Sequence, residues 1–203
     1  MSLTPEQRLV LPLDVEDIEE AKKIISDCKK QAGVFKINSL FTLYGKEIVE
    51  EIQNAGCRCF LDLKFHDIPN TVSNYARAAA RLGIYMFNVH CSGGLEMMKA
   101  GAEAARDEAE AMGFERPMVL GVTVLTSTDN DVMNSEMRVD GDVRDQVVHL
   151  AKLAKKAGLD GVVASAKEAE MIRKACGDGF VILTPGIRPS WAAKNDQKRV
   201  VTP

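Results

Sequence analysis

The chain has 203 residues, of which 46% are hydrophobic and 27% are charged, and its formal net charge at pH 7 is −3. This composition is ordinary for a globular protein with one sizeable core, and it excludes a disordered chain. The acidic balance argues against nucleic acid as a partner. No apolar run approaches the ~20 residues of a membrane span and the N-terminus lacks a signal-peptide pattern, so we expect a cytoplasmic protein that does not bind membranes.

Strands and helices alternate along the whole sequence. Short apolar runs rich in β-formers predict strands, and apolar residues at helical spacing predict helices. In chain order we expect a strand at residues 8–14, a helix at 15–31, a strand at 34–38, a helix at 44–55, a strand at 57–63, a helix at 69–82, a strand at 85–90, a helix at 95–112, a strand at 117–123, a loop at 126–140 followed by a helix to 157, a strand at 160–164, a helix to 176 and a strand at 180–183.

This alternation predicts a parallel α/β sheet, and the number of units favours a (β/α)8 barrel over an open doubly wound sheet. No strand is followed by G-x-G-x-x-G, which weakens a dinucleotide-binding alternative. Without a linker or repeat, residues 1–203 are expected to form a single barrel catalytic domain. A closed barrel needs another strand after Pro203, so we expect the eighth strand and helix to be missing from this sequence, with an incomplete barrel as the alternative.

The most informative stretch is FLDLKFHDIPNT, which begins at Phe60. Because successive side chains of a strand point to opposite faces, Asp62 and Lys64 share one face, with Phe60 beneath them. Asp67 falls at the turn, and Pro69 fits the first turn of the next helix. A lone Asp-x-Lys would favour a surface ion pair. The second aspartate, at the carboxyl end of a buried strand, indicates a functional site instead.

The order of the charges bears on mechanism. A lysine between two carboxylates is stabilised as the ammonium, whereas a Schiff-base lysine needs a neutral amine. We therefore interpret Lys64 as a proton donor that Asp62 and Asp67 orient. Lys36 lies within a buried strand and needs a partner, for which Asp62 is a candidate. Asp14 ends the first strand, where it either caps the next helix or binds a ligand.

The pattern Asp62-x-Lys64-x-x-Asp67-Ile-Pro-x-Thr71 resembles the signature of the orotidine 5'-phosphate decarboxylases, and DLKFHDIPNT is similar to their bacterial branch. The resemblance covers essentially the whole chain. It implies decarboxylation of orotidine 5'-monophosphate to UMP and CO2 in pyrimidine biosynthesis, with Lys64 protonating C6 of the pyrimidine. It also implies that neither a metal nor an organic cofactor is required.

The same resemblance implies roles for individual residues. Asp14 would bind the ribose, Lys36 would join the charge network and hydrogen-bond the nucleotide substrate, and Asp62 would sit against the departing carboxylate. Asp67 and Thr71 would reach across a homodimer interface into the neighbour's site, so that the active sites are shared. The alternative for these two is a local role, with Asp67 capping its helix and Thr71 filling the first turn.

Three more residues are assigned to the substrate. Thr126 matches the family's hydroxyl residue that contacts the pyrimidine, although a Ser/Thr turn is also common. The string TPGIR, which ends at Arg188, places a guanidinium where barrels often bind phosphate. Gln197 resembles the end of the family's phosphate-gripping loop. Asn38, in place of the usual glycine, and Pro12, in place of a small residue, depart from the family pattern.

The sequence gives no sign of a metal or disulfide site. The cysteines are odd in number and lack C-x-x-C spacing, so reduced thiols in or near the core are expected for Cys28, Cys57, Cys59, Cys91 and Cys176. His90 ends a strand without a second ligand at metal-binding spacing, which favours a hydrogen-bonded structural role.

Two other functions stay open. One is a sugar-phosphate decarboxylase or synthase of the same barrel superfamily, which would use Mg²⁺ with these carboxylates. Sensitivity to a chelator separates it from the metal-free reaction. The other is a non-catalytic barrel that binds a nucleotide or a partner without turnover.

Overall fold

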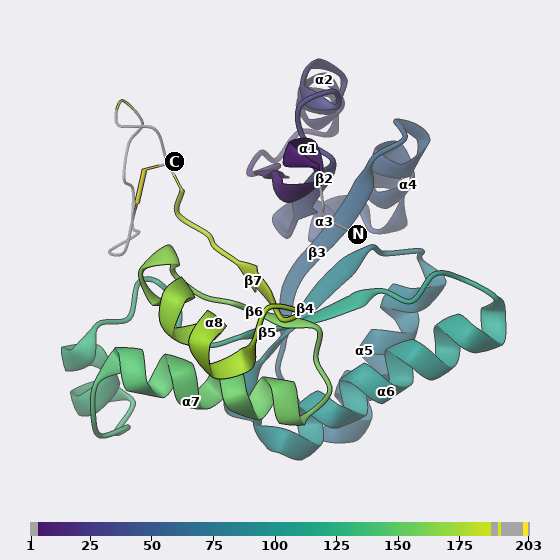
Figure 1. Ribbon diagram of the computed structural model, residues 1–203. Coiled ribbons are helices and arrows are strands. Elements are labelled where there is room, and N and C mark those ends of the chain that lie inside the picture. Colours follow the sequence, from purple (N-terminus) through teal and green to yellow (C-terminus); the bar gives the residue numbers. More distant parts are fainter. Residues whose placement is uncertain (1–3, 188–190, 192–200, 203) are drawn as a thin grey trace.

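The computed structural model describes residues 4–187, 191 and 201–202. Within these residues, seven strands form one parallel sheet, and each pairs with the next strand in the sequence (Figure 1). The strands are β1 (Val10–Pro12), β2 (Val34–Ile37), β3 (Arg58–Phe65), β4 (Met86–His90), β5 (Met118–Val122), β6 (Gly161–Val163) and β7 (Val181–Leu183). A doubly wound sheet reverses its strand order at the middle, whereas a barrel winds in one direction. The sequential order therefore confirms the predicted barrel-type α/β fold.

Helices between successive strands cover the outer side of the curved sheet, and one short helix precedes the first strand (Figure 1). They are α1 (Pro5–Arg8), α2 (Ile18–Cys28), α3 (Ser39–Tyr44), α4 (Lys46–Asn54), α5 (Pro69–Arg81), α6 (Gly94–Met112), α7 (Val143–Lys156) and α8 (Ala169–Cys176), with the short helices η1 (Cys91–Gly93), η2 (Val132–Glu136) and η3 (Ala166–Glu168). Pro69 occupies the first turn of α5, as predicted. None of the helices in the described part of the chain is long and apolar enough to cross a membrane.

The alternation of side chains along the strands builds two apolar clusters. Phe35, Leu61 and Phe87 point toward the helices and belong to the larger cluster. The smaller cluster lies on the inner face and contains Val34, Phe60, Met86 and Leu120. Phe60 thus forms part of an apolar floor beneath Asp62 and Lys64, as the period of the strand predicted.

Several element boundaries differ from those predicted. The first strand was expected from residue 8, but residues 5–8 form α1, because Thr4 and Gln7 make a capping box at its start. The short helix α3 and the π-helix η2 were not predicted, since each is too short to show a helical period. β3 continues to Phe65, two residues beyond the predicted end of that strand.

Gly161 in β6 is required by the close approach of β7. A Cβ atom at this position would collide with the main-chain carbonyl and the Cβ of Val181. We expect Gly161→Ala to lower the free energy of unfolding by about 1–3 kcal/mol, because a buried backbone has to shift. Urea denaturation measures the change. Gly179→Ala, where no atom lies within 4 Å of the new methyl group, is the control, and equal losses in both variants would contradict the explanation.

Candidate active site

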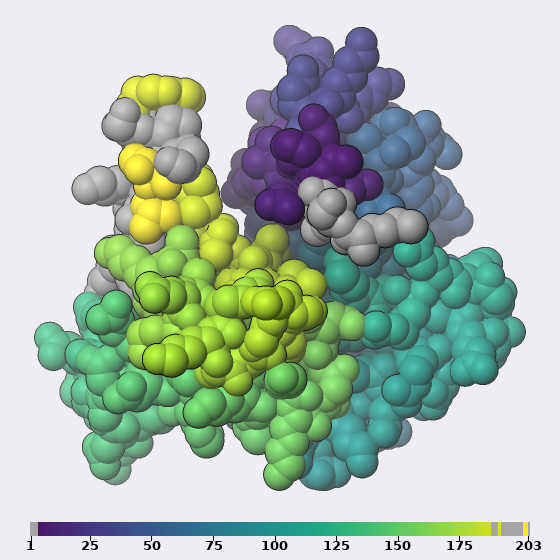
Figure 2. Space-filling model, viewed as in Figure 1, coloured from purple at the N-terminus to yellow at the C-terminus, as the bar shows by residue number. Residues whose placement is uncertain are grey.

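A cavity of about 1080 Å³ opens where the strands end. Its wall includes residues that follow β1, β2, β5, β6 and β7, namely Asp14, Asn38, Thr126, Ala164 and Thr184. Figure 2 shows the surface hollowed between the N-terminal part, in purple, and the yellow-green segment that follows β7. The carboxyl ends of the strands are where parallel barrels place their functional groups.

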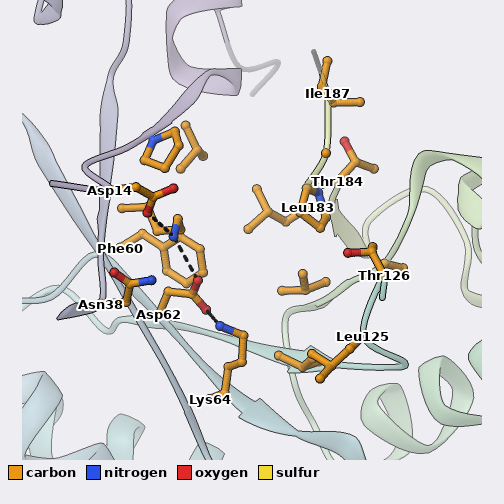
Figure 3. A pocket seen from close by; sticks show the side chains of 18 of the residues that line it. Asp14, Asn38, Phe60, Asp62, Lys64, Leu125, Thr126, Leu183, Thr184 and Ile187 are labelled. Carbon is orange, nitrogen blue, oxygen red and sulfur yellow. Dashed lines mark hydrogen bonds and ion pairs between the residues drawn. The ribbon is translucent and has the colours of Figure 1, made fainter. Parts of the chain in front are cut away.

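Four charged side chains form a continuous chain along one wall of this cavity (Figure 3). The ammonium nitrogen of Lys64 lies 2.8 Å from Oδ1 of Asp62, and the ammonium of Lys36 lies 3.2 Å from Oδ2 of the same carboxylate. Lys36 also contacts Oδ1 of Asp14 at 3.3 Å. The side chain of Asp62 is 12% exposed and that of Lys64 is 35% exposed, so the carboxylate is sheltered while the ammonium reaches the cavity. The predicted partnership of Lys36 with Asp62 is confirmed.

The far wall carries Thr126, which was predicted to contact the pyrimidine. Thr126 lines the cavity and is buried, and Figure 3 shows it across the cavity from Asp62. Thr184, on the segment after β7, lines the same cavity. Arg188 and Gln197, which were assigned to phosphate, lie outside the described residues.

Asp67 and Thr71 do not line the cavity of their own chain. Asp67 is exposed at the turn after β3, and its carboxylate accepts a hydrogen bond from the main-chain nitrogen of Ile68 at 2.7 Å. Ile68 is the N-cap of α5, so Asp67 does not occupy the capping position considered for it. Thr71 is half-buried in the first turn of α5. The large apolar side chains of Ile68 and Tyr75 are exposed on the same segment.

The two departures from the family pattern have local explanations. The side chain of Asn38 accepts a hydrogen bond from the main-chain nitrogen of Ser39 at 2.6 Å and caps α3, while it also lines the cavity. Pro12 lies in β1, which pairs only with β2 among the described strands. Leu13 donates its main-chain N–H to the carbonyl of Lys36 at 2.9 Å, so the nitrogen of Pro12 points away from β2 and its missing N–H costs no hydrogen bond between β1 and β2.

One polar residue of the site was missed by the sequence analysis. Asn88 lies in β4, is 1% exposed, and donates a hydrogen bond from Nδ2 to Oδ1 of Asp62 at 2.6 Å. Asparagine is depleted in strands. The residues of β4 on the same face are Met86, which is apolar, and His90, which is partly buried. An asparagine in the middle of a buried parallel strand was therefore the available signal.

The cysteines within the described part of the chain are all free, as predicted. Burial raises the pKa of the Cys59 thiol and of the Cys91 thiol to about 12 in each case. A nucleophilic cysteine needs a depressed pKa, so these two behave as core thiols. Within the described residues, no three side chains of His, Cys, Asp or Glu gather in a way that would hold a metal ion.

His90 ends β4 beside the charged chain, and its ring stacks at an angle against that of His66 with centroids 5.3 Å apart. Burial lowers the pKa of His90 from its ordinary value of 6.5, and nearby His66 and Lys64 lower it further. The unfolded chain therefore binds this proton more readily than the folded chain does. Stability contributed by the neutral ring is fully present above pH 6.5 and is lost as the pH falls toward the lowered folded value.

We expect the free energy of unfolding to fall between pH 7.5 and 5.5, and His90→Gln to make that fall shallower, as measured by urea denaturation at about these two pH values. His149→Gln, at an exposed position of α7, is the control and should retain the wild-type dependence. An unchanged slope in His90→Gln would show that another group carries the effect.

The barrel-type sheet and the row of aspartate and lysine side chains at its carboxyl edge together define a (β/α)-barrel enzyme of the decarboxylase and synthase group. The chain belongs to the orotidine 5'-phosphate decarboxylase / HUMPS family, whose model matches residues 7–203.

Relatives within this family are similar over almost the whole chain. The orotidine 5'-phosphate decarboxylase of Syntrophomonas wolfei is 48% identical over 98% of this chain and 84% of its own. That of Moorella thermoacetica is 46% identical over 97% of this chain and 78% of its own. The crystal structure of orotidine 5'-phosphate decarboxylase from Lactobacillus acidophilus superposes with a TM-score of 0.82 and 38% identity, covering 90% of this chain and 82% of that one.

Proposed function

We propose that this protein decarboxylates orotidine 5'-monophosphate to UMP and CO2 in pyrimidine biosynthesis. The observation that carries the proposal is the Lys64 ammonium, held 2.8 Å from the Asp62 carboxylate and presented to the cavity. The similarity to decarboxylases of that name, at 46–48% identity over nearly the whole chain, supports it. The reaction belongs to a biosynthetic pathway of the cytoplasm, which is where we place the protein.

The chemistry follows from the charge order of the site. Loss of CO2 breaks the bond from C6 of the pyrimidine to the carboxyl carbon and leaves the electron pair on C6. The Lys64 ammonium stabilises that developing negative charge and then transfers a proton to C6, which completes UMP. Asp62 faces the departing carboxylate and keeps the ammonium in place. A fixed ammonium needs little reorganisation during the reaction, which is what makes a preorganised site effective.

Three residues of the cavity wall contact the rest of the nucleotide in this proposal. Asp14 binds the ribose, Lys36 hydrogen-bonds the substrate from the charged chain, and Thr126 contacts the pyrimidine from the far wall. Arg188 and Gln197 bind the phosphate. Binding energy from a phosphate distant from C6 orders the site around the reacting carbon.

The working unit in this proposal is a homodimer of single-domain subunits with shared active sites. Asp67 and Thr71 complete the neighbour's site rather than their own. Two observations support this: neither residue lines the cavity of its own chain, and Ile68 is 66% exposed beside them. Tyr75 on the same segment is 39% exposed, and several exposed apolar side chains rimmed by polar groups are typical of a protein interface.

The sugar-phosphate alternative is less well supported by the contacts of Asp62. Its two oxygens already accept from Lys64, Lys36 and Asn88, whereas Mg²⁺ would need carboxylate oxygens directed at the ion. A non-catalytic module would not need an ammonium oriented in this way.

The test is to follow the pyrimidine absorbance with orotidine 5'-monophosphate as substrate, with and without EDTA. We expect turnover at the same rate in both conditions. Turnover that EDTA abolishes and Mg²⁺ restores, with a keto-sugar phosphate as the better substrate, would establish the sugar-phosphate enzyme instead. Binding of UMP without any turnover would establish the binding module.

A further inference from the structure

The side-chain amide of Asn88, in β4, hydrogen-bonds two residues of the neighbouring strand β3. Its Nδ2 donates to Oδ1 of Asp62 at 2.6 Å, and its Oδ1 accepts from the main-chain nitrogen of Lys64 at 2.8 Å. The first contact fixes a carboxylate and the second fixes the backbone of the lysine. A side-chain amide supplies a donor and an acceptor on two separate atoms, whereas an ionised carboxylate lacks the donor and an ammonium lacks the acceptor.

The orientation of the amide follows from its partners. Rotating the side chain by half a turn would set its oxygen against the Asp62 carboxylate and its NH₂ group against the Lys64 N–H. Both contacts would then pair like with like, so one orientation alone satisfies both partners. Because Asn88 is 1% exposed, water does not compete for either hydrogen bond.

Asn88 also lies where the ladder between β3 and β4 is interrupted. Pairing passes from Leu61 opposite Phe87 to Phe65 opposite Val89, so β3 advances four residues while β4 advances two. Lys64 lies inside this bulge with φ at +50°, a conformation that residues other than glycine rarely adopt. The Asn88 oxygen thus supplies the main-chain hydrogen bond that Lys64 loses at the bulge.

The same carboxylate oxygen receives both the Asn88 amide and the Lys64 ammonium. The bulge directs the lysine side chain, and the amide sets the carboxylate that the ammonium contacts. Asn88 therefore influences the position of the Lys64 ammonium nitrogen in two ways, through the backbone of Lys64 and through the carboxylate that the ammonium contacts. Asn88 is not among the residues that line the cavity.

We propose that Asn88 is a positioning residue for decarboxylation, whose amide holds the Asp62 carboxylate and the bulged Lys64 backbone so that the ammonium meets C6. The role rests on the proposed function. It acts through Lys64 and Asp62 and involves no contact with the substrate. Its loss should therefore lower turnover while leaving nucleotide binding nearly unchanged.

The first test is Asn88→Ala, with kcat and KM measured on orotidine 5'-monophosphate. We expect kcat to fall about 10- to 100-fold, because a misplaced reacting group loses near-attack geometry. KM and inhibition by the product UMP should stay within about threefold, since uniform binding is retained. Asn130→Ala is the matched control: Asn130 makes the same pair of contacts, to the Asp142 carboxylate and the Val143 N–H, away from the cavity lining. Its kcat should remain at the wild-type value.

The second test is Asn88→Asp, which keeps the shape and the acceptor for the Lys64 N–H but replaces the donor. When ionised, the new group sets a second carboxylate against Asp62. When protonated, it regains a donor. The activity of this variant relative to wild type should therefore rise as the pH is lowered from about 8 to about 5. Urea denaturation of this variant at the same pH values separates the two effects, because a general weakening of the fold would lower activity only where the folded fraction falls.

Either variant can overturn the proposed role of Asn88. A kcat for Asn88→Ala within about twofold of wild type, or a drop no larger than that of Asn130→Ala, overturns the role. If Asn88→Ala does not fold, the pH dependence of Asn88→Asp decides alone, and a ratio independent of pH overturns it. Wild-type protein assayed alongside tests the proposed function separately. If the wild type does not decarboxylate orotidine 5'-monophosphate, the proposed function fails, whatever the variants do.

Discussion

Lys64→Ala is expected to abolish decarboxylation while the protein stays folded. Removing the ammonium takes away both the positive charge beside C6 and the proton that UMP needs, so the loss in kcat should be about 10³-fold or more. Asp62 would still contact Lys36 and Asn88, so the carboxylate is not left without partners. Turnover is followed by pyrimidine absorbance, and folding by circular dichroism and urea denaturation.

The cost in stability should be small because Lys64 is partly exposed and a pair of this kind contributes up to about 1 kcal/mol. Lys99→Ala is the control, since Lys99 pairs with Glu103 on the exposed side of α6 and should leave turnover unchanged. Turnover close to that of wild type in Lys64→Ala would remove the assigned role of the lysine.

Mixing two inactive variants is expected to restore activity if the sites are shared between subunits. Lys64→Ala and Asp67→Asn each damage every site of their own homodimer. In a mixed dimer one site contains both changes and the other contains neither, so random exchange should restore about a quarter of the wild-type activity. The measurement is turnover after subunit exchange, with exchange verified by mass or by a tag on one subunit.

The matched control mixes Lys64→Ala with Asp62→Asn. These residues contact each other within one chain at 2.8 Å, so every site of that mixed dimer carries one change and no activity should return. Absence of recovery in the Asp67 mixture, with exchange verified, would assign each site to a single chain. Asp67 would then have a local role at the start of α5.

The sequence was sufficient for the architecture because the relevant signals are local. Short apolar runs that alternate with amphipathic helices predict a parallel sheet, and the structure arranges the strands in sequential order. The period of two along β3 also predicted that Phe60, Asp62 and Lys64 share the inner face. Lys36 is a charged residue in a buried strand, which predicted that it pairs with an acidic side chain. Its ammonium lies 3.2 Å from the Asp62 carboxylate.

Elements shorter than one or two turns could not be predicted in the same way. The helices α1 and α3 have four and six residues, too few to show a helical period. α1 is defined by a capping box at Thr4, and α3 begins at the Asn38 cap. In each case local side-chain hydrogen bonds, rather than a hydrophobic pattern, fix where the helix starts.

The sequence by itself determined the barrel-type winding, the face that carries the charges and the identity of Lys64 and Asp62 as neighbours. Tertiary structure alone decided that Asp14, after β1, contacts Lys36 in β2 and that Lys64 occupies a bulge. It also decided that Asn88 links Lys64 to Asp62. The physical reason is that these contacts depend on the register between strands. Register is set by packing of the whole sheet, so residues 22 to 26 positions apart meet in ways that no local period encodes.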